Sequence, residues 1–549
     1  MDGETKDGKT TKEDLLSPSG IPLKAVYDYG DAKRPDEKAL GSPGQYPFTR
    51  GLYPLGYRKF SWVTQQVSGF GLAEDTNARQ KLLIESGQAH YGGQPNVNIV
   101  FDIPTHYGYD CDHPMVTDEV GKCGVSICTL DDMERLFEGL PLEKLNTSLL
   151  GFGSAPVILG MYVALADRRG IPRAQLRGVI TNNTLGGFAG TNYHVFPLQA
   201  TVRLILDIIK FCSEEMPKWN TLNIDGYTIR ETGANAVQEL AFTLCMALEV
   251  VRQLVRQGEN VDDFAPRLGF FFTVSSNFFE EIAKIRAARR LWARFMREEF
   301  HARDPRSCHL RLHCDTAGSA LTAREPLNNI ARVALQALAA VLAGTQGLHT
   351  CSYDEVYGLP GDEAVRVAVK TQKIIEYETG VADVVDPLGG SYYVEALTDA
   401  MEERALEYIR KVDSMGGYLG AVERGYVQQE VSRSAMDYQR KVERGEIVIV
   451  GVNKYESHSQ ADIAPQPYDP GVRDRAVSRL LEYRQHRSPG EVEQALEEVR
   501  ETAQAPDQNI MPPIIAAVKA CATLGDIMAT LKEVFGAPDR KLEQGICSR

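Results

Sequence analysis

The sequence predicts an α/β fold class: eight parallel strands, each followed by a helix, closed into one barrel. Eight short apolar runs recur along the chain, and a stretch with helical periodicity follows each run through a polar turn. The runs are too short for helices and lack polar–apolar alternation, which is typical of strands buried on both faces. They are residues 98–102, 148–153, 178–182, 222–226, 267–273, 310–314, 347–351 and 383–387.

Polar side chains gather where these predicted strands end. In a parallel barrel this rim carries the chemistry, so the pattern predicts an enzyme. His313 and Asp315 are two residues apart on one strand and therefore face the same side. His313 and His349 stand at neighbouring strand ends, which favours a functional role over a structural one. The full set is Asp102, Asn182, Asp225, Thr273, His313, Asp315, His349 and Asp386.

Three regions are expected around this TIM barrel. Residues 1–40 are predicted to form a disordered tail and an N-terminal arm. Residues 41–400 carry the barrel itself. Residues 401–549 predict a C-terminal helical extension with a linker and one strand at 446–453.

Residues 278–300 have the clearest helical pattern. Glu280 and Lys284 are spaced for an ion pair along the helix. One face is expected to point inward, and it carries Phe278, Ile282, Ile285, Arg289, Trp292 and Phe295.

Composition narrows the function. The 549 residues are 43% hydrophobic and can bury a large core. With 60 basic and 74 acidic residues the net charge is −14, which argues against general binding to nucleic acid or to an anionic membrane. Ten cysteines without a Cys-x-x-Cys pair indicate reduced thiols. No secretory signal or membrane-spanning run is present, so a cytoplasmic protein is expected.

Two local constellations leave alternatives open. Residues 50–62 interleave Arg50, Arg58 and Lys59 with aromatic residues, which suits an adenine nucleotide. On composition alone an ordinary solvated loop is favoured there. Residues 108–114 place two Asp and one His together, but the spacing does not match a zinc site, and bracing of the barrel rim is favoured.

Several long motifs, in order, carry a family resemblance. From about residue 40 to the end, the chain resembles the large, substrate-binding subunit of the adenosylcobalamin-dependent acyl-CoA mutases, the methylmalonyl-CoA mutase family. This resemblance implies a barrel threaded by the pantetheine arm of coenzyme A, with cobalamin at the strand ends and a radical rearrangement of the acyl carbon skeleton. The motifs are YPFTRGLYP (46–54), GFGLAEDTN (69–77), FDIPTHYGYDCDHP (101–114), FAPRLGFFF and NFFEEIAKIRAARRLW (within 264–292), GLHTCSYDE (347–355) and DPLGGSYYVE (386–395).

The resemblance also implies a split enzyme. Family members with their own cobalamin domain contain an Asp-x-His-x-x-Gly motif, and none of the ten histidines here fits it. No cobalamin-binding domain is therefore expected in this chain. Adenosylcobalamin is expected to be held mainly by a separate small cobalamin-binding subunit, in a heterotetramer or another heteromer.

Site residues follow from the resemblance, position by position, and no metal ion is expected among them. The catalytic group is expected to be His313, Thr228 and Asp315. The substrate and coenzyme A group is expected to be Tyr53, Arg50, Val67, Thr181, Thr191 and Arg267. The cobalamin-facing group is expected to be Tyr227, Glu231, Gly318 and Glu355.

Several of these positions depart from the family pattern. Val67 stands where the family has an aromatic ring above the acyl group, and Thr191 where an Arg pairs the methylmalonyl carboxylate. Thr228 replaces a His that binds the substrate carbonyl, and Asp315 and Thr181 each replace a Gln.

These departures predict a branched acyl-CoA without a second carboxylate. A buried carboxylate lacking its Arg would cost several kcal/mol. The 2-hydroxyisobutyryl-CoA mutases also have a small residue at the Val67 position, but their Asp is Val100 here, so that substrate is not transferred. Methylmalonyl-CoA mutase proper and a non-catalytic, partner-binding paralogue remain as alternatives.

Overall fold

The computed structural model describes residues 15–28, 30, 31, 40–90, 93–191, 194–456, 463 and 466–536. Its main strands form two five-stranded sheets, ordered β3-β12-β11-β10-β9 and β4-β5-β6-β7-β8. All strand pairs within them are parallel except β4 with β5. The strands are β3 (Val63–Thr64), β4 (Ala89–His90), β5 (Gln94–Val100), β6 (Asn146–Leu150), β7 (Gly178–Ile180), β8 (Trp219–Asn220), β9 (Leu222–Asp225), β10 (Leu268–Val274), β11 (Arg311–Thr316) and β12 (Gly347–His349).

The two sheets are linked at both edges. On one side β8 is followed by β9 after a single residue. On the other side Ser68, just after β3, forms a parallel bridge with Ile99 of β5. A small antiparallel pair, β1 (Leu15–Leu16) with β2 (Pro22–Leu23), stands apart in the N-terminal arm. The parallel α/β architecture is therefore present, as two edge-linked sheets.

Seven of the predicted strands are present, and the prediction for residues 383–387 is wrong. Those residues form turns, and Asp386 is held by Arg50 and Arg286 rather than at a strand end. The place beside β12 is taken by β3, in which only two residues pair. The strand expected at 446–453 is also wrong, since only an isolated bridge joins Val450 to Lys454.

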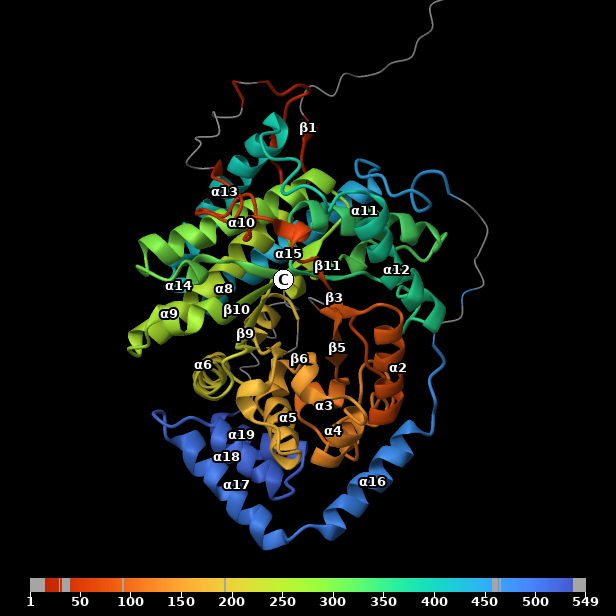
Figure 1. Cartoon of the computed structure of the whole chain (residues 1–549), viewed down its shortest axis with the longest axis vertical. Helices are drawn as coiled ribbons and strands as arrows, with labels where there is room; N and C mark the ends of the chain where they lie inside the picture. Colours follow the sequence, from red (N-terminus) through yellow and green to blue (C-terminus); the bar gives the residue numbers. More distant parts are fainter. Residues whose placement is uncertain are drawn as a thin grey trace, which may run out of the picture.

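Helices surround the strands (Figure 1), and α16 to α19 form the lower end of the molecule in that view. The first eleven are α2 (Ala73–Glu85), α3 (Ile103–Tyr107), α4 (Leu130–Leu136), α5 (Ala155–Arg168), α6 (Leu198–Glu215), α7 (Tyr227–Glu231), α8 (Ala236–Arg256), α9 (Val261–Phe264), α10 (Phe278–Glu298), α11 (Asn328–Leu342) and α12 (Asp362–Glu378). The others are α13 (Tyr392–Asp413), α14 (Gly417–Glu423), α15 (Tyr426–Glu443), α16 (Val472–His486), α17 (Pro489–Gln504), α18 (Met511–Lys519) and α19 (Leu524–Phe535).

The helix predicted over 278–300 is confirmed as α10, and its inward arginine is fully enclosed. Arg289 donates to the carbonyl oxygens of Phe48, Thr49 and Ala343. The predicted Glu280–Lys284 pair is wrong. Lys284 binds Glu281 and Glu239 instead, because its ammonium is buried among them.

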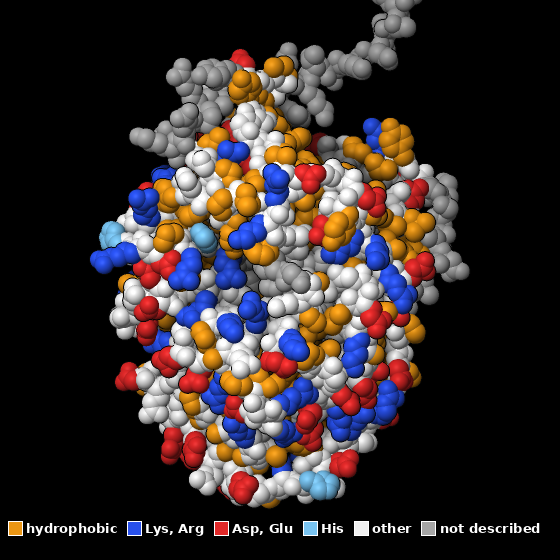
Figure 2. All heavy atoms as spheres, viewed as in Figure 1, with side chains coloured by type: hydrophobic (Ala, Val, Ile, Leu, Met, Phe, Trp, Pro, Cys, Tyr) orange, Lys and Arg blue, Asp and Glu red, His pale blue; other side chains and the backbone are white. Residues whose placement is uncertain are grey.

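The hydrophobic core lies between the strands and the helices. One cluster joins β9, β10 and β11 to α8, α10 and α13, and the other joins β5 and β6 to α5 and the C-terminal helices. Acidic and basic side chains are interspersed over the lower part of the face in Figure 2. No helix within the described residues has the length and apolar character needed to cross a bilayer.

The acidic loop at 108–114 braces the structure, which is the interpretation that its sequence favoured over a zinc site. Asp110 and Asp112 both pair with Arg484 of α16. Asp110 also accepts hydrogen bonds from the Thr523 hydroxyl (2.6 Å) and the Gly525 amide (2.9 Å) at the start of α19. This loop therefore fastens the C-terminal helices to the strands.

Candidate active site between the strands

Side chains on the strand faces opposite the apolar core are largely polar, and the region that they face is here called the lumen. On β5, Val97 and Ile99 pack into the outer core, so Asn96 and Asn98 face the opposite side. Asn96 accepts a hydrogen bond from the Asn146 amide (2.7 Å), and Asn98 Oδ1 is buried without a partner. Most barrels fill this space with bulky aliphatic residues. A polar lining instead suits a long polar ligand.

Strand β11 sets a sequence of charges along the lumen. Leu312 and Cys314 belong to the outer core, so Arg311, His313 and Asp315 face inward. Arg311 and His313 keep partial exposure although the residue between them is buried. At ~3.3 Å per residue, Arg311 and Asp315 lie roughly 13 Å apart along the strand. A cation, an imidazole and a carboxylate thus follow one another from the amino end to the carboxyl end.

His313 has one ring nitrogen engaged and one free. Its Nε2 lies 2.7 Å from Asp315 Oδ1, while Nδ1 is buried without a partner among the described residues. Nδ1 faces Gly347, where an added Cβ would come within 2.6 Å of it. Asp315 therefore fixes the ring, and a protonated His313 would donate from Nδ1 to an oxygen in the lumen.

The predicted cobalamin-facing residues of α7 and the β11 loop are brought together. Tyr227 stacks on Phe271 with ring centroids 5.0 Å apart. Glu231 accepts hydrogen bonds from the Ser319 amide (2.8 Å) and hydroxyl (3.1 Å). An added Cβ on Gly318 would lie 3.6 Å from both Glu231 Oε2 and the Tyr227 hydroxyl. Burial raises the pKa of Glu231, and raises the pKa of Tyr227 well above its usual value.

Thr228 uses its hydroxyl hydrogen inside the protein. The hydroxyl donates to Asp225 Oδ2 (2.5 Å), and the Thr228 amide donates to Asp225 Oδ1 (2.9 Å). Asp225 thereby caps the start of α7. In this arrangement Thr228 offers a ligand only an acceptor.

His349, at the end of β12, contacts the Val67 backbone and lies close to Cys351 and Glu355. The Val67 amide donates to His349 Nδ1 (3.1 Å), so a neutral His349 carries its proton on Nε2. His349, Cys351 and Glu355 have ligand atoms within 4.8 Å of one another, a set that could hold a metal ion by residue type. A protonated Nε2 has no lone pair for a metal, so His349 acts there as a hydrogen-bond donor. Burial raises the pKa of Glu355.

Two predicted binding residues, Arg267 and Tyr53, lie near the amino ends of β10 and β11. Arg267 directly precedes β10 and donates to the Asp263 carbonyl, and its Nε is buried without a partner. The Tyr53 ring lies edge-on to His309, two residues before β11. Arg50 is neutralised by Asp386 (3.0 Å).

Two threonines on the β7 side are engaged in local contacts. Thr181, just after β7, accepts a hydrogen bond from the Asn223 amide (3.4 Å). The Thr191 hydroxyl donates to the Gly187 carbonyl (3.1 Å), within its own turn.

Sequence reasoning missed the asparagines of the lumen. Asn96, Asn98, Asn146 and Asn223 belong to predicted strands or adjoin them, but only the strand ends were considered as site positions. The alternation of Asn with aliphatic residues in 96–99 was the available signal.

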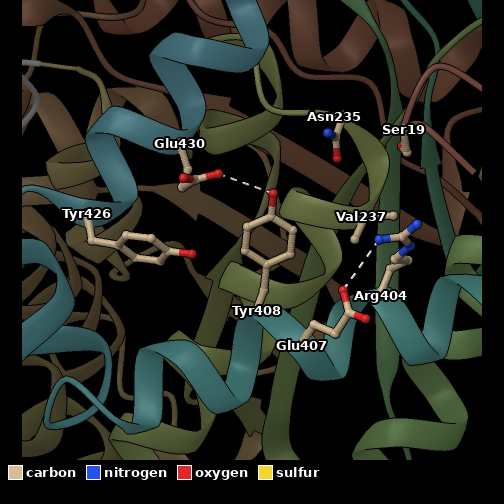
Figure 3. Close-up of a pocket in the computed structure, with 8 residues that line it drawn as sticks. All are labelled: Ser19, Asn235, Val237, Arg404, Glu407, Tyr408, Tyr426 and Glu430. Atoms are coloured by element: carbon tan, nitrogen blue, oxygen red, sulfur yellow. Dashed lines mark hydrogen bonds and ion pairs between the residues drawn. The ribbon is translucent and has the colours of Figure 1, made fainter.

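A second cavity, of about 300 Å³, lies outside the lumen between α8, α13 and α15 (Figure 3). The Tyr408 hydroxyl donates to Glu430 (3.2 Å), and Arg404 pairs with Glu407 (3.5 Å). Two pairs of the labelled groups thus bind each other, whereas Ser19 Oγ is buried without a partner among the described residues. None of the lining residues is a predicted site residue, so this cavity is not the candidate active site.

Polar strand faces, with a cation at one end of β11 and a carboxylate at the other, are typical of an enzyme built on a parallel α/β fold. Residues 16–537 match the family described as Methylmalonyl-CoA mutase. The 2-hydroxyisobutanoyl-CoA mutase large subunit of Aquincola tertiaricarbonis is 41% identical over 532 residues, 97% of this chain and 94% of that protein. Methylmalonyl-CoA mutase of Cereibacter sphaeroides is 43% identical over 518 residues (94% and 72%). The human mitochondrial enzyme is 39% identical over 527 residues (95% and 69%).

The chain belongs to the methylmalonyl-CoA mutase family. It is an acyl-CoA mutase, an isomerase, and the family resemblance drawn from the sequence motifs is confirmed.

Proposed function

We propose that this chain is the large subunit of an adenosylcobalamin-dependent mutase that rearranges a neutral, branched acyl-CoA. Residues 41–400 would close around the lumen as one barrel, with coenzyme A entering at the amino ends of the strands. One relative of similar length is itself named a large subunit, which supports a separate small cobalamin-binding subunit and a heteromer. We place the assembly in the cytoplasm.

The acidic character of the carboxyl end carries the substrate proposal. Burial is the main cause that raises the pKa of Asp225 to about 6, and neighbouring Asp315 acts in the same direction. Besides burial, the charge of Asp315 raises the pKa of Glu231. Besides burial, the charges of Glu231, Asp315 and Glu355 raise the pKa of Tyr227. A second carboxylate on the acyl group would meet this like charge in a medium of low dielectric.

The cation on α7 is not available to pair with such a carboxylate. Arg230 of α7 is already engaged by Glu281 (3.4 Å) and Glu239 (3.6 Å). Thr191, at the position of the family's pairing Arg, has a hydroxyl that donates to Gly187. A dicarboxylic acyl group such as methylmalonyl would therefore lack a partner for its charge.

The residues at the carboxyl end fit the chemistry of adenosylcobalamin. Half-buried Glu231, Glu355 and Tyr227 would supply acceptors and a donor for the amide and hydroxyl groups of that cofactor. When bound, adenosylcobalamin supplies the organic radical that removes hydrogen from the acyl group.

The chain itself binds, orients and encloses the substrate. Arg267 faces the coenzyme A phosphates, and the asparagines of the lumen hydrogen-bond the pantetheine amides. His313 Nδ1 binds the thioester oxygen, with the ring held by Asp315. Phe271 and Tyr227 form an apolar wall that limits access of water.

A hydroxylated branched acyl group is a second candidate. Within the described part of the chain, the side chain of Asp315 is hydrogen-bonded only by His313, through Oδ1, which leaves Oδ2 for a donor on the ligand. The name of the Aquincola relative includes a 2-hydroxyacyl group. Because Val100 stands where the resemblance places an Asp in such enzymes, Asp315 would have to supply the acceptor.

The test is turnover in the reconstituted enzyme. The chain is mixed with its small subunit and adenosylcobalamin, and kcat/KM is compared for methylmalonyl-, isobutyryl-, isovaleryl-, pivalyl- and 2-hydroxyisobutyryl-CoA. Loss of a charge-assisted pair of about 3 kcal/mol predicts a more than roughly hundredfold preference for the neutral thioesters. Pivalyl- and 2-hydroxyisobutyryl-CoA differ by a methyl against a hydroxyl group, so their ratio tests the second candidate.

Three other outcomes would contradict parts of this proposal. Comparable turnover of methylmalonyl-CoA would overturn the neutral substrate and favour methylmalonyl-CoA mutase proper. No turnover of any thioester would favour the non-catalytic paralogue. Stoichiometric cobalamin on the purified chain alone would contradict the separate cobalamin subunit.

A further inference from the structure

We propose that a buried ionic network of Arg230, Glu239, Glu281 and Lys284 positions α7 for the cofactor-loaded small subunit. This role rests on the proposed function, which places Tyr227 and Glu231 of α7 toward the cofactor. None of the four residues enters the lumen chemistry described above, yet the network joins α7 to the end of β10.

The network compensates for a strand that leaves its sheet early. β9 pairs with β10 only as far as Asp225 opposite Phe271, while β11 stays paired as far as Val274 opposite Thr316. Gly226 still donates to the Phe271 carbonyl, after which the chain turns into α7. Thr273 therefore has an amide and a carbonyl on the β9 side with no strand beside them, and burying such groups unpaired is costly.

Two side chains take the place of the missing strand. Glu239 of α8 accepts a hydrogen bond from the Thr273 amide (2.7 Å). Lys284 of α10 donates to the Thr273 carbonyl (2.6 Å). Lys284 also pairs with Glu239 (2.6 Å), so the two groups that replace the strand are bonded to each other.

Arg230 brings α7 into the same network. It reaches Glu281 (3.4 Å) and Glu239 (3.6 Å), and its guanidinium also donates to the Ala234 carbonyl after the helix. The side chains of Lys284, Glu239 and Glu281 are 0% exposed, and Arg230 is 18% exposed. Two cations and two carboxylates balance in charge.

Such a network fixes the relative positions of the elements that it joins more than it stabilises the fold. A buried ion pair can often be replaced by apolar residues without loss of stability, but removing one partner leaves an uncompensated charge. The position of α7 thus depends on Arg230, while the amino end of the lumen is held by other contacts. Loss of Arg230 should disturb the cofactor side of the site and spare the coenzyme A side.

The experiment compares Arg230→Met with Arg252→Met. Arg252 on α8 also bridges two carboxylates, Glu299 (2.8 Å) and Asp413 (2.6 Å), with 21% of its side chain exposed, but it is not part of this network. Amide hydrogen exchange is followed in peptides covering 226–234 in the isolated chain. Acyl-CoA affinity is measured by calorimetry, and the half-saturating concentration of the cofactor-loaded small subunit is measured in turnover assays.

In Arg230→Met, exchange at 226–234 should rise about tenfold or more, because α7 opens locally. The half-saturating concentration of the small subunit should also rise about tenfold, with acyl-CoA affinity within about twofold of wild type. Arg230→Lys should restore most of both effects, and Arg252→Met should show neither.

Unchanged exchange at 226–234, or an equal loss of acyl-CoA affinity, would overturn the inference. If Arg230→Met does not fold, Glu281→Gln, which keeps the shape and removes the charge facing Arg230, is measured in the same way. If wild-type chain binds acyl-CoA but never engages a small subunit, the proposed function fails, and the exchange measurement alone decides the role of the network.

Discussion

The two ends of the lumen differ in charge, and the difference explains how one channel can orient its substrate. At the amino end Arg267 has a buried Nε without a partner, and Arg311 faces inward. At the carboxyl end Asp225, Asp315 and Glu231 interact with one another. Coenzyme A carries its charge on its phosphates and none on the thioester. Under the proposed function, an acyl-CoA with its phosphates at the amino end would place them beside the arginines. The reversed orientation would place the phosphates beside the carboxylates, and a charged acyl group would place its own carboxylate there.

The largest effect should come from removing a charge at the amino end. Arg267→Ala should weaken acyl-CoA binding by roughly 10- to 150-fold, because a hydrogen bond to a charged phosphate contributes about 1.5–3 kcal/mol. Calorimetry with the isolated chain measures this. Arg306→Ala is the matched control, since Arg306 is exposed and pairs only with Asp304 among the described residues. Equal losses in the two variants, or an Arg267→Ala variant that simply unfolds, would contradict a phosphate site at Arg267.

A smaller effect is expected from filling the carboxyl end. Val67→Phe should shift the kcat/KM ratio of isobutyryl- to pivalyl-CoA upward by about tenfold, because one methylene-sized difference in an apolar pocket is worth about 1–3 kcal/mol. The same change at Val356, which is exposed, serves as the control. An unchanged ratio would mean that the acyl group does not lie against Val67.

The smallest effect should come from pH, and it separates the two ends directly. Burial raises the pKa of Asp225 to about 6, so this carboxyl group is mostly neutral below that pH and mostly charged above it. The arginines keep their charge throughout. Discrimination against methylmalonyl-CoA should therefore fall severalfold from pH 7.5 to pH 5.5. The 3′-phosphate of coenzyme A, with a second pKa of about 6, titrates equally in all the thioesters and cancels from this ratio. A ratio that is flat or that rises on acidification would remove the carboxylates as its cause.

Sequence patterns predicted the strands whose paired residues form apolar runs, and they failed where pairing was brief or absent. β3 pairs through only two residues, so 63–64 carried too little pattern to detect. Residues 383–387 have an apolar centre, but Asp386 forms ion pairs with Arg50 and Arg286 instead of ending a strand. Lys284 pairs with Glu239 and Glu281 and not with Glu280, because contacts made in the buried interior outweigh the spacing of charges along the helix.

The candidate site shows the same contrast between features that the sequence predicts and features that it does not. The family resemblance supplied the residues, and the structure groups Tyr227, Glu231 and Gly318 as expected positions around one end of the lumen. Side-chain partners were not predictable: the sequence could not show that Thr228 donates to Asp225 or that Asp315 holds His313. Such choices depend on rotamers set by the packed neighbours of each residue.

Under the proposed function, the polar lining of the lumen also makes the substrate part of the folded interior. Because the apolar core lies outside the strands, the centre of the fold is filled by whatever occupies the lumen. By mass action, a ligand that binds only the native state adds about 2.7 kcal/mol to the free energy of unfolding at a hundred times its Kd. The supply of acyl-CoA in the cell would then govern how long each chain survives heat and proteolysis, as well as how fast it turns over.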